Sequence, residues 1–151
     1  EKQATPEFSL LELDLVARCV MRVDLALHAA PEYLERRGRP SAPSSFVDHD
    51  LVAFMEGPGS ELENAWLAEN CPGARVVLRT NSVATVVEAV REGLGLGLAP
   101  RRIGDRDPRL VRLETPRPPT PREVWLAYHQ DIEPSPRVRA VIDFLVETLS
   151  E

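Results

Sequence analysis

Residues 76–100 read VVLRTNSVATVVEAVREGLGLGLAP, and this stretch decides the predicted fold. The short β-branched run at 76–78 predicts a buried strand. From Ser82 onward the apolar residues recur with the helical period, which predicts a helix that ends at Gly93. The run of alternating glycine and leucine that follows predicts a second strand, which closes at Pro100. A strand, a helix and a strand in this order are typical of an α/β fold.

Strands and helices alternate on both sides of this stretch as well. Residues 115–122, TPRPPTPR, interrupt the alternation, and such a proline-rich run predicts a stiff extended connector. We expect little regular structure in residues 1–13 and a loop at 39–45. The predicted class is therefore α/β with a largely parallel sheet. The remaining predicted elements are strands at 23–29, 51–54, 110–113 and 124–129, and helices at 31–37, 60–68 (capped by Ser60, with Leu62, Ala65 and Trp66 on one face) and 136–149.

The composition of this 151-residue chain excludes several classes of protein. Hydrophobic residues make up 43% and charged residues 28%, which is enough for a packed core. No apolar run approaches the roughly 20 residues that a transmembrane helix needs, and no export signal is visible in the first six residues. The net charge of -6 argues against a nucleic-acid-binding surface, because phosphates require clustered Lys and Arg. We expect a cytoplasmic protein that does not bind a membrane.

Motifs for catalysis and for metal binding are weak in this chain. The three histidines fall in separate segments, and Cys19 and Cys71 have neither metal nor redox spacing, so we expect buried or half-buried thiols. The glycine run at 93–97 follows a helix and enters a strand, whereas a phosphate-binding loop needs the reverse order. The polar cluster at 48–50 is expected on a surface loop. We therefore expect no enzyme, no catalytic residue, no metal and no cofactor.

Thr80, Asn81 and Ser82 form the most informative polar segment. They lie between a predicted strand and a predicted helix, at the carboxyl edge of the sheet, where open α/β sheets bind their ligands. The N-terminus of the helix adds unpaired amides that favour anions. The alternative is that Asn81 or Ser82 merely caps the helix, and from these residues alone the cap is favoured over the ligand site.

The order and spacing of four segments resemble the effector-binding domain of LysR-type transcriptional regulators. These segments are residues 14–46, 81–102, 108–113 and 123–147, and together they cover most of the chain. The matched family motifs are a strand-to-helix turn at 30–34 (APEYL), a glycine-rich passage at 93–100 (GLGLGLAP) and a closing helix at 135–145 (SPRVRAVIDFL).

The resemblance implies a type II periplasmic-binding-protein-like fold with one complete lobe and part of a second. Residues 1–23 would be a remnant of lobe one, residues 24–114 would form lobe two, and residues 115–151 would be the crossover and the C-terminal part of lobe one. The N-terminal DNA-binding domain and the first half of lobe one would be absent from this chain. The apolar faces of 124–128 and 138–149 would then lack partners and stay partly exposed, and we expect that they pack on a neighbouring chain or that the chain self-associates.

The same resemblance implies that the chain senses a small-molecule effector and does not catalyse a reaction. Effector binding between the lobes would shift the conformation of a homo-oligomer, a dimer or tetramer, which contacts DNA only through the absent domain. A solute-binding protein of a transport system with the same fold is the alternative. With the resemblance added, we favour Asn81 and Ser82 as ligand contacts, and Glu56 as a solvated loop carboxylate. The effector-binding positions implied are Phe54, Met55, Glu56, Thr80, Asn81, Ser82 and Pro100.

Overall fold

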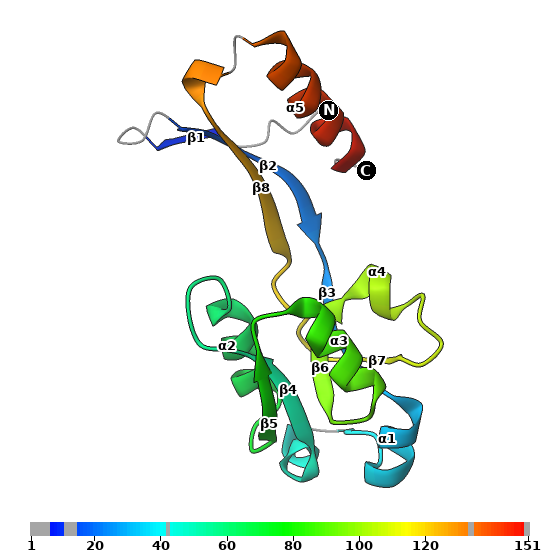
Figure 1. Cartoon of the computed structure of the whole chain (residues 1–151). Helices are drawn as coiled ribbons and strands as arrows, with labels where there is room; N and C mark the ends of the chain where they lie inside the picture. The colour runs from blue at the N-terminus through cyan, green and yellow to red at the C-terminus, as the bar shows by residue number, and fades with distance from the viewer. Residues whose placement is uncertain (1–6, 11–14, 42, 133–134, 150–151) are drawn as a thin grey trace. The chain divides into compact units, whose positions relative to one another are not determined.

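The structure is a computed structural model that describes residues 7–10, 15–41, 43–132 and 135–149. The chain forms two compact units, and each has its own β-sheet (Figure 1). Unit 1 comprises Glu1–Val23 and Pro121–Glu151, and unit 2 comprises Asp24–Thr120. Among the described residues, no helix has the length and apolar character needed to cross a membrane.

Unit 1 contains a three-stranded antiparallel sheet and one long helix. The strand β1 (Glu7–Leu10) pairs with β2 (Leu15–Val23), which pairs in turn with β8 (Arg122–His129), as Figure 1 shows. A short 3-10 helix, η2 (Gln130–Ile132), follows β8, and α5 (Pro136–Leu149) contacts β2. The expectation of little regular structure in residues 1–13 is wrong at 7–10, and the strand at 15–23 was not predicted. The run LVARCVMRV of β2 does not alternate apolar and polar residues, so its strand character is not visible in the pattern.

The helix α5 has no fully buried side chain among the described residues. Val141 is 57% exposed and Phe144 is 64% exposed, and Trp125 of β8 is also exposed. The predicted exposure of apolar residues in 124–128 and 138–149 is therefore confirmed. That a neighbouring chain covers these residues stays a prediction.

Unit 2 is built on a five-stranded mixed sheet with the strand order β5-β4-β6-β3-β7. The strand β4 is parallel to both β5 and β6, whereas β3 is antiparallel to both β6 and β7. The prediction of a largely parallel sheet is wrong for this reason. The periodicity of apolar residues identifies a strand but carries no information on its direction. The bounds are β3 (Leu25–Ala29), β4 (Asp50–Phe54), β5 (Arg75–Thr80), β6 (Leu96–Pro100) and β7 (Val111–Leu113).

Five helical segments connect these strands. Gly38, which ends the first, and Gly93, which follows the third, have φ values of 81° and 71°, so both predicted helix ends are confirmed. A 3-10 helix occupies part of the segment predicted as a loop at 39–45. The segments are α1 (Pro31–Arg37), η1 (Pro43–Asp48), α2 (Glu61–Asn70), α3 (Val83–Arg91) and α4 (Arg101–Gly104).

Alternating side chains divide the core of unit 2 into two layers, one on each face of the sheet. Leu51 packs in a cluster with Tyr33 of α1 and with apolar residues of α2. Its neighbour in β4, Val52, belongs to a second cluster with Val90 and other residues of α3. A Cβ at Gly97 would lie 2.7 Å from Val90 Cγ2, so this glycine allows α3 to approach β6 closely. The role of this glycine in the run at 93–97 is therefore close packing between helix and strand.

Burial differs from the prediction in β5 and in α2. The strand predicted to be buried at 76–78 is an edge strand, and Val76 and Val77 are both exposed. In α2, Leu62 is 64% exposed, and Trp66 is the buried member of the predicted face. Edge position and helix rotation depend on which elements pair in space, and the apolar pattern of one element does not specify them.

His49 is buried, which corrects the expectation of a surface loop at 48–50. The Tyr33 hydroxyl accepts a hydrogen bond from the backbone N–H of Asp50 at 2.8 Å and lies 3.2 Å from His49 Nδ1. The hydroxyl and the imidazole are thus hydrogen-bonded to each other, and these polar groups satisfy one another inside the unit.

Candidate functional site

The last residues of β4, β5 and β6 lie at one edge of the sheet in unit 2. Phe54 and Thr80 are direct partners in the parallel register of β4 and β5. Because β6 is parallel to β4, its last residue, Pro100, lies at the same carboxyl edge. The backbone N–H of Met55 donates to the Thr80 carbonyl at 3.0 Å, which extends the contact beyond the strand end. The strand-end residues predicted for effector binding are therefore at a common edge.

The link from β5 to α3 consists of Thr80, Asn81 and Ser82. Ser82 Oγ accepts a hydrogen bond from the N–H of Thr85 at 3.3 Å, so Ser82 caps α3. Thr80 Oγ1 accepts from the N–H of Ser82 at 3.2 Å. Asn81 is exposed, and its side chain makes no hydrogen bond to any other described residue. The cap is thus present at Ser82, while the amide of Asn81 is free to contact a ligand.

Met55 and Glu56 follow β4 and are both exposed. The Glu56 side chain is 84% exposed, and its Oε1 lies 3.7 Å from Nη2 of Arg79. An ion pair this open to solvent adds little to stability, so Glu56 is a solvated loop carboxylate. Arg79 also donates from Nη1 to the Phe54 carbonyl at 3.1 Å. Arg79 directly precedes the predicted segment, but no pattern in the sequence marks it as a site residue.

Two side chains near the start of α2 hold the backbone at the end of β4. Asn64 Oδ1 accepts from the N–H of Phe54 at 3.2 Å, and Asn64 Nδ2 donates to the Phe54 carbonyl at 3.0 Å. Ser60 precedes α2, but its hydroxyl lies 2.6 Å from the Met55 carbonyl and 3.0 Å from the Gly57 carbonyl. The predicted cap by the Ser60 side chain is therefore wrong, because this hydroxyl is used by the preceding loop.

Pro100 ends β6 and is partly buried. It pairs with Leu25 of β3, and the next residue, Arg101, donates its backbone N–H to the Asp24 carbonyl at 2.8 Å. Since proline has no N–H, Pro100 can offer a ligand only apolar surface and its carbonyl oxygen.

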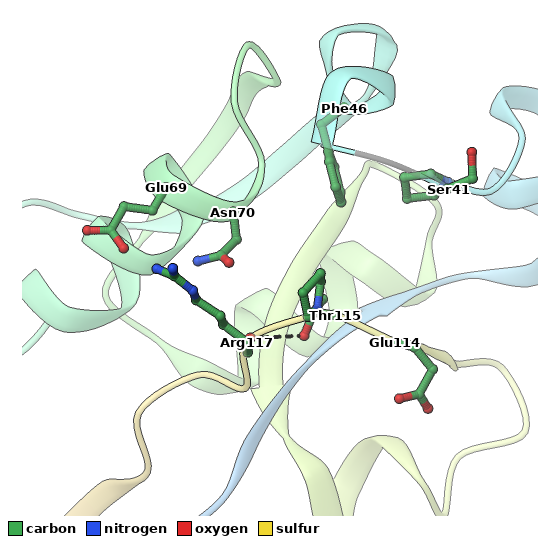
Figure 2. A pocket seen from close by; sticks show the side chains of 9 residues that line it. Ser41, Phe46, Glu69, Asn70, Glu114, Thr115 and Arg117 are labelled. Atoms are coloured by element: carbon green, nitrogen blue, oxygen red, sulfur yellow. Dashed lines mark hydrogen bonds between the residues drawn. The ribbon is translucent and has the colours of Figure 1, made fainter.

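Two pockets in unit 2 are lined by other residues. One has a volume of about 370 Å³, and Figure 2 shows several of its side chains. The other has a volume of about 240 Å³. None of the seven predicted positions lines either pocket. Both pockets are lined in part by residues of the proline-rich stretch. The sequence predicts this stretch only as a connector, so its contribution to the pockets was not predicted. The first pocket is lined by residues 40–41, Phe46, 69–70 and 114–117, and the second by residues 25–26, Arg101, 112–115 and 118–119.

The two cysteines are free, and neither is among the residues of this edge. Cys71 is buried, and burial raises its pKa to about 12, while Cys19 is half-buried. Both thiols are therefore as predicted. Within the described ranges, no three His, Cys, Asp or Glu residues are arranged to hold a metal ion.

Residues 5–150 match the family described as the LysR substrate binding domain. The regulatory domain of CrgA, a LysR-type transcriptional regulator from Neisseria meningitidis, is similar at 26% identity. The TM-score is 0.74, over 90% of this chain and 70% of that chain. The regulatory domain of AphB in Vibrio vulnificus shares the fold, at 24% identity and a TM-score of 0.66, over 94% of this chain and 72% of that chain. Among curated proteins, no match was found.

Whole regulators of this type are longer than this chain. It covers 51% of the longer CrgA structure, with 25% identity and a TM-score of 0.72 over 95% of this chain. The fold agrees with the predicted type II periplasmic-binding-protein-like class, and the matched family is not one of enzymes. The match spans nearly all of the sequence. The chain therefore belongs to the LysR substrate-binding domain family, the effector-sensing domain of LysR-type transcriptional regulators.

Proposed function

We propose that the carboxyl edge of β4, β5 and β6 in unit 2 binds the small-molecule effector of the regulator. LysR-type regulators bind small-molecule effectors and act as oligomers on DNA. The observation that supports this site is the exposed amide of Asn81, which has no hydrogen-bond partner among the described residues. It lies between the hydroxyl of Thr80 and the N-terminus of α3. An amide and a hydroxyl beside free helix amides are donors suited to a polar ligand.

The effector that fits these groups has a polar or anionic end and an apolar part. The N-terminus of α3 favours negative charge, and Asn81 adds a donor there. Phe54, Met55 and Pro100 offer apolar surface for the remainder of the molecule. The carboxylate of Glu56 is paired with Arg79, which reduces its repulsion of an anionic effector.

The proposed response to the effector is a shift in conformational population, without catalysis. A ligand changes such an equilibrium only by the difference between its affinities for the two states. We assign lobe two to residues 24–114 and parts of lobe one to residues 1–23 and 115–151. The effector would favour one conformation of a cytoplasmic homo-oligomer, whose separate DNA-binding domain responds to that change.

The test is a thermal-shift screen of small carboxylates and amides, followed by titration of the best compound into four proteins. These are the wild type, Asn81→Ala, Thr80→Val and, as a matched control, Thr148→Val at an exposed position of α5. A compound bound at the edge loses about tenfold in affinity when one good hydrogen bond to it is removed. We expect that loss in Asn81→Ala and Thr80→Val and no change in Thr148→Val. Equal affinity for all four proteins would place the effector elsewhere and refute the proposed site.

A further inference from the structure

The pocket of about 370 Å³ in unit 2 is large enough for a small organic molecule. Pockets that bind such ligands have volumes of roughly 300 to 1,000 Å³ and mostly apolar walls. Here Phe46, which is buried, points into the pocket, and Pro40 and Pro116 also line it (Figure 2). The apolar part of a ligand would pack on these three side chains.

Two opposite charges line this pocket without neutralising each other. Arg117 extends toward Asn70 and Glu69 at the end of α2, as Figure 2 shows. Among the described residues, neither the guanidinium of Arg117 nor the carboxylate of Glu69 has an ion-pair partner. Asn70 donates from Nδ2 to the Trp66 carbonyl at 2.9 Å, which leaves its Oδ1 available as an acceptor. The pocket therefore offers a cation, an anion and a neutral acceptor to a ligand.

The backbone of Arg117 is fixed before any ligand binds. Its carbonyl oxygen accepts a hydrogen bond from Trp66 Nε1 at 3.2 Å and another from Thr115 Oγ1 at 3.1 Å. Trp66 is itself buried in the core of the unit. The guanidinium therefore projects from an anchored position, which lowers the entropy cost of holding a ligand there.

Glu114 also lines the pocket, but its carboxylate already has a partner. Its Oε1 lies 3.6 Å from Nε of Arg112. In Figure 2 the side chain of Glu114 lies on the opposite side of the pocket from that of Glu69. The carboxylate that a ligand cation would meet without competition is therefore that of Glu69.

We propose that this pocket binds a zwitterionic amino acid with an apolar or aromatic side chain. This site is distinct from the effector edge, the carboxyl edge of β4, β5 and β6 proposed above for the effector. The ligand carboxylate pairs with Arg117, and its ammonium group donates to Glu69 and to Oδ1 of Asn70. Its side chain packs on Phe46 and Pro116. A ligand with only one charge leaves one of the two protein charges without a partner, so the zwitterion is preferred.

A ligand in this pocket would connect α2 to the segment that leads out of unit 2. Residues 114–117 follow β7 directly and precede β8 in the chain. They are already joined to α2 by the hydrogen bond from Trp66, and two ligand contacts would add to that link. Binding would therefore slow amide hydrogen exchange at Thr115 and Arg117.

The test uses three probes that share one phenylethyl group: L-phenylalanine, phenethylamine and 3-phenylpropanoate. Isothermal titration into the 151-residue chain measures each affinity. L-phenylalanine should bind at least about tenfold more tightly than either singly charged analogue, because each analogue lacks one charge-assisted contact. Arg117→Gln and Glu69→Gln should each weaken L-phenylalanine binding by about tenfold. The control Arg102→Gln, at an exposed residue outside the pocket, should leave it unchanged.

Three results would overturn the proposal. One is the absence of L-phenylalanine binding to the wild type at about 10 mM, a ligand concentration that reveals even weak sites. Another is equal affinity for all three probes. The third is loss of L-phenylalanine binding in Asn81→Ala with retention in Arg117→Gln, which would place the amino acid at the effector edge and leave the proposed function intact. Melting temperatures of the variants equal to that of the wild type would show that all of them fold.

Discussion

Gly104 packs directly against the imidazole of the buried His28, and a Cβ at residue 104 would overlap the atoms of that ring. Gly104 is the last residue of α4, and His28 lies in β3. His28 Nδ1 is 2.9 Å from the Ala26 carbonyl, whereas the buried Nε2 has no hydrogen-bond partner among the described residues and lies 4.0 Å from Asp105 Oδ1. The helix α4 can therefore close over β3 because residue 104 has no side chain.

Gly104→Ala should destabilise the protein through overpacking. A methyl group forced into a filled core displaces its neighbours and costs about 1–3 kcal/mol. The free energy of unfolding, measured in urea, should fall by that amount. Arg106→Ala, a neighbouring exposed substitution, should change the free energy by less than about 0.5 kcal/mol. A Gly104→Ala protein as stable as the wild type would show that α4 does not pack on His28 in this way.

Stability should decrease as the pH falls below about 6.5, because the folded protein disfavours the charged form of His28. Burial is the main cause that lowers the pKa of His28 from its usual value of 6.5, and Arg112 adds to it, against the opposing effects of Ala26 and Asp105. The unfolded chain then binds a proton more readily than the folded chain does. The stabilisation is present above pH 6.5 and is lost as the pH falls toward the lowered pKa of the folded state.

Two measurements check this pH dependence. The free energy of unfolding should decrease between about pH 7.5 and pH 5.5, a range above the usual pKa values of most carboxylates. His49 contributes in the same direction, because burial and the nearby Arg37 lower its pKa as well. NMR titration of the native protein separates the two imidazoles, and both midpoints should lie below 6.5. A His28 midpoint at or above that value would contradict the buried, neutral imidazole.

Local sequence patterns predicted the individual elements of unit 2 well. The helical period from Ser82, the cap by that residue and the left-handed Gly93 are all confirmed in α3, because they depend on neighbours within one turn. Strand direction and edge position depend on distant pairing. The residues of β3 are all buried, and such a strand looks the same whether its neighbours run parallel or antiparallel to it.

The candidate site was predictable in part for the same reason. The position of Thr80 and Asn81 at the carboxyl edge follows from a strand that leads into a helix, and β4, β5 and β6 are indeed parallel there. Asn64 and Arg79, which both bond to the backbone of Phe54, could not be found in this way. Their contacts span 10 and 25 residues of sequence, and no local period encodes them.

Cys71 should resist alkylation in the folded protein. Burial raises its pKa to about 12, and only the thiolate reacts, so at about pH 8 only about one thiol in ten thousand is reactive. Mass spectrometry after iodoacetamide treatment should find Cys19, which is half-buried, modified well before Cys71. Both should react when the chain is unfolded in urea. Equal rates for the two cysteines in the native protein would mean that the region around Cys71 opens readily.

Asn64→Ala should destabilise the end of β4 and with it the effector edge. This substitution removes the hydrogen bond that Asn64 Oδ1 accepts from the N–H of the buried Phe54, and loss of a hydrogen bond to a buried backbone group costs about 1–3 kcal/mol. Asn64→Asp keeps an acceptor and loses only the donor to the Phe54 carbonyl, which Arg79 still contacts, so its cost should be smaller. Urea unfolding measures both, and amide exchange at Phe54 should accelerate in Asn64→Ala.

The matched control for this prediction is Asn81→Ala, which removes an exposed amide that bonds to no other described residue. In the absence of ligand it should change the free energy of unfolding by less than about 0.5 kcal/mol. If Asn64→Ala and Asn81→Ala had the same small effect, the two hydrogen bonds to Phe54 would not hold the strand end. If only Asn64→Ala is destabilised, the side-chain amide of Asn64 in α2 positions residues 54–56, while the side chain of Asn81 adds nothing to the stability of the fold.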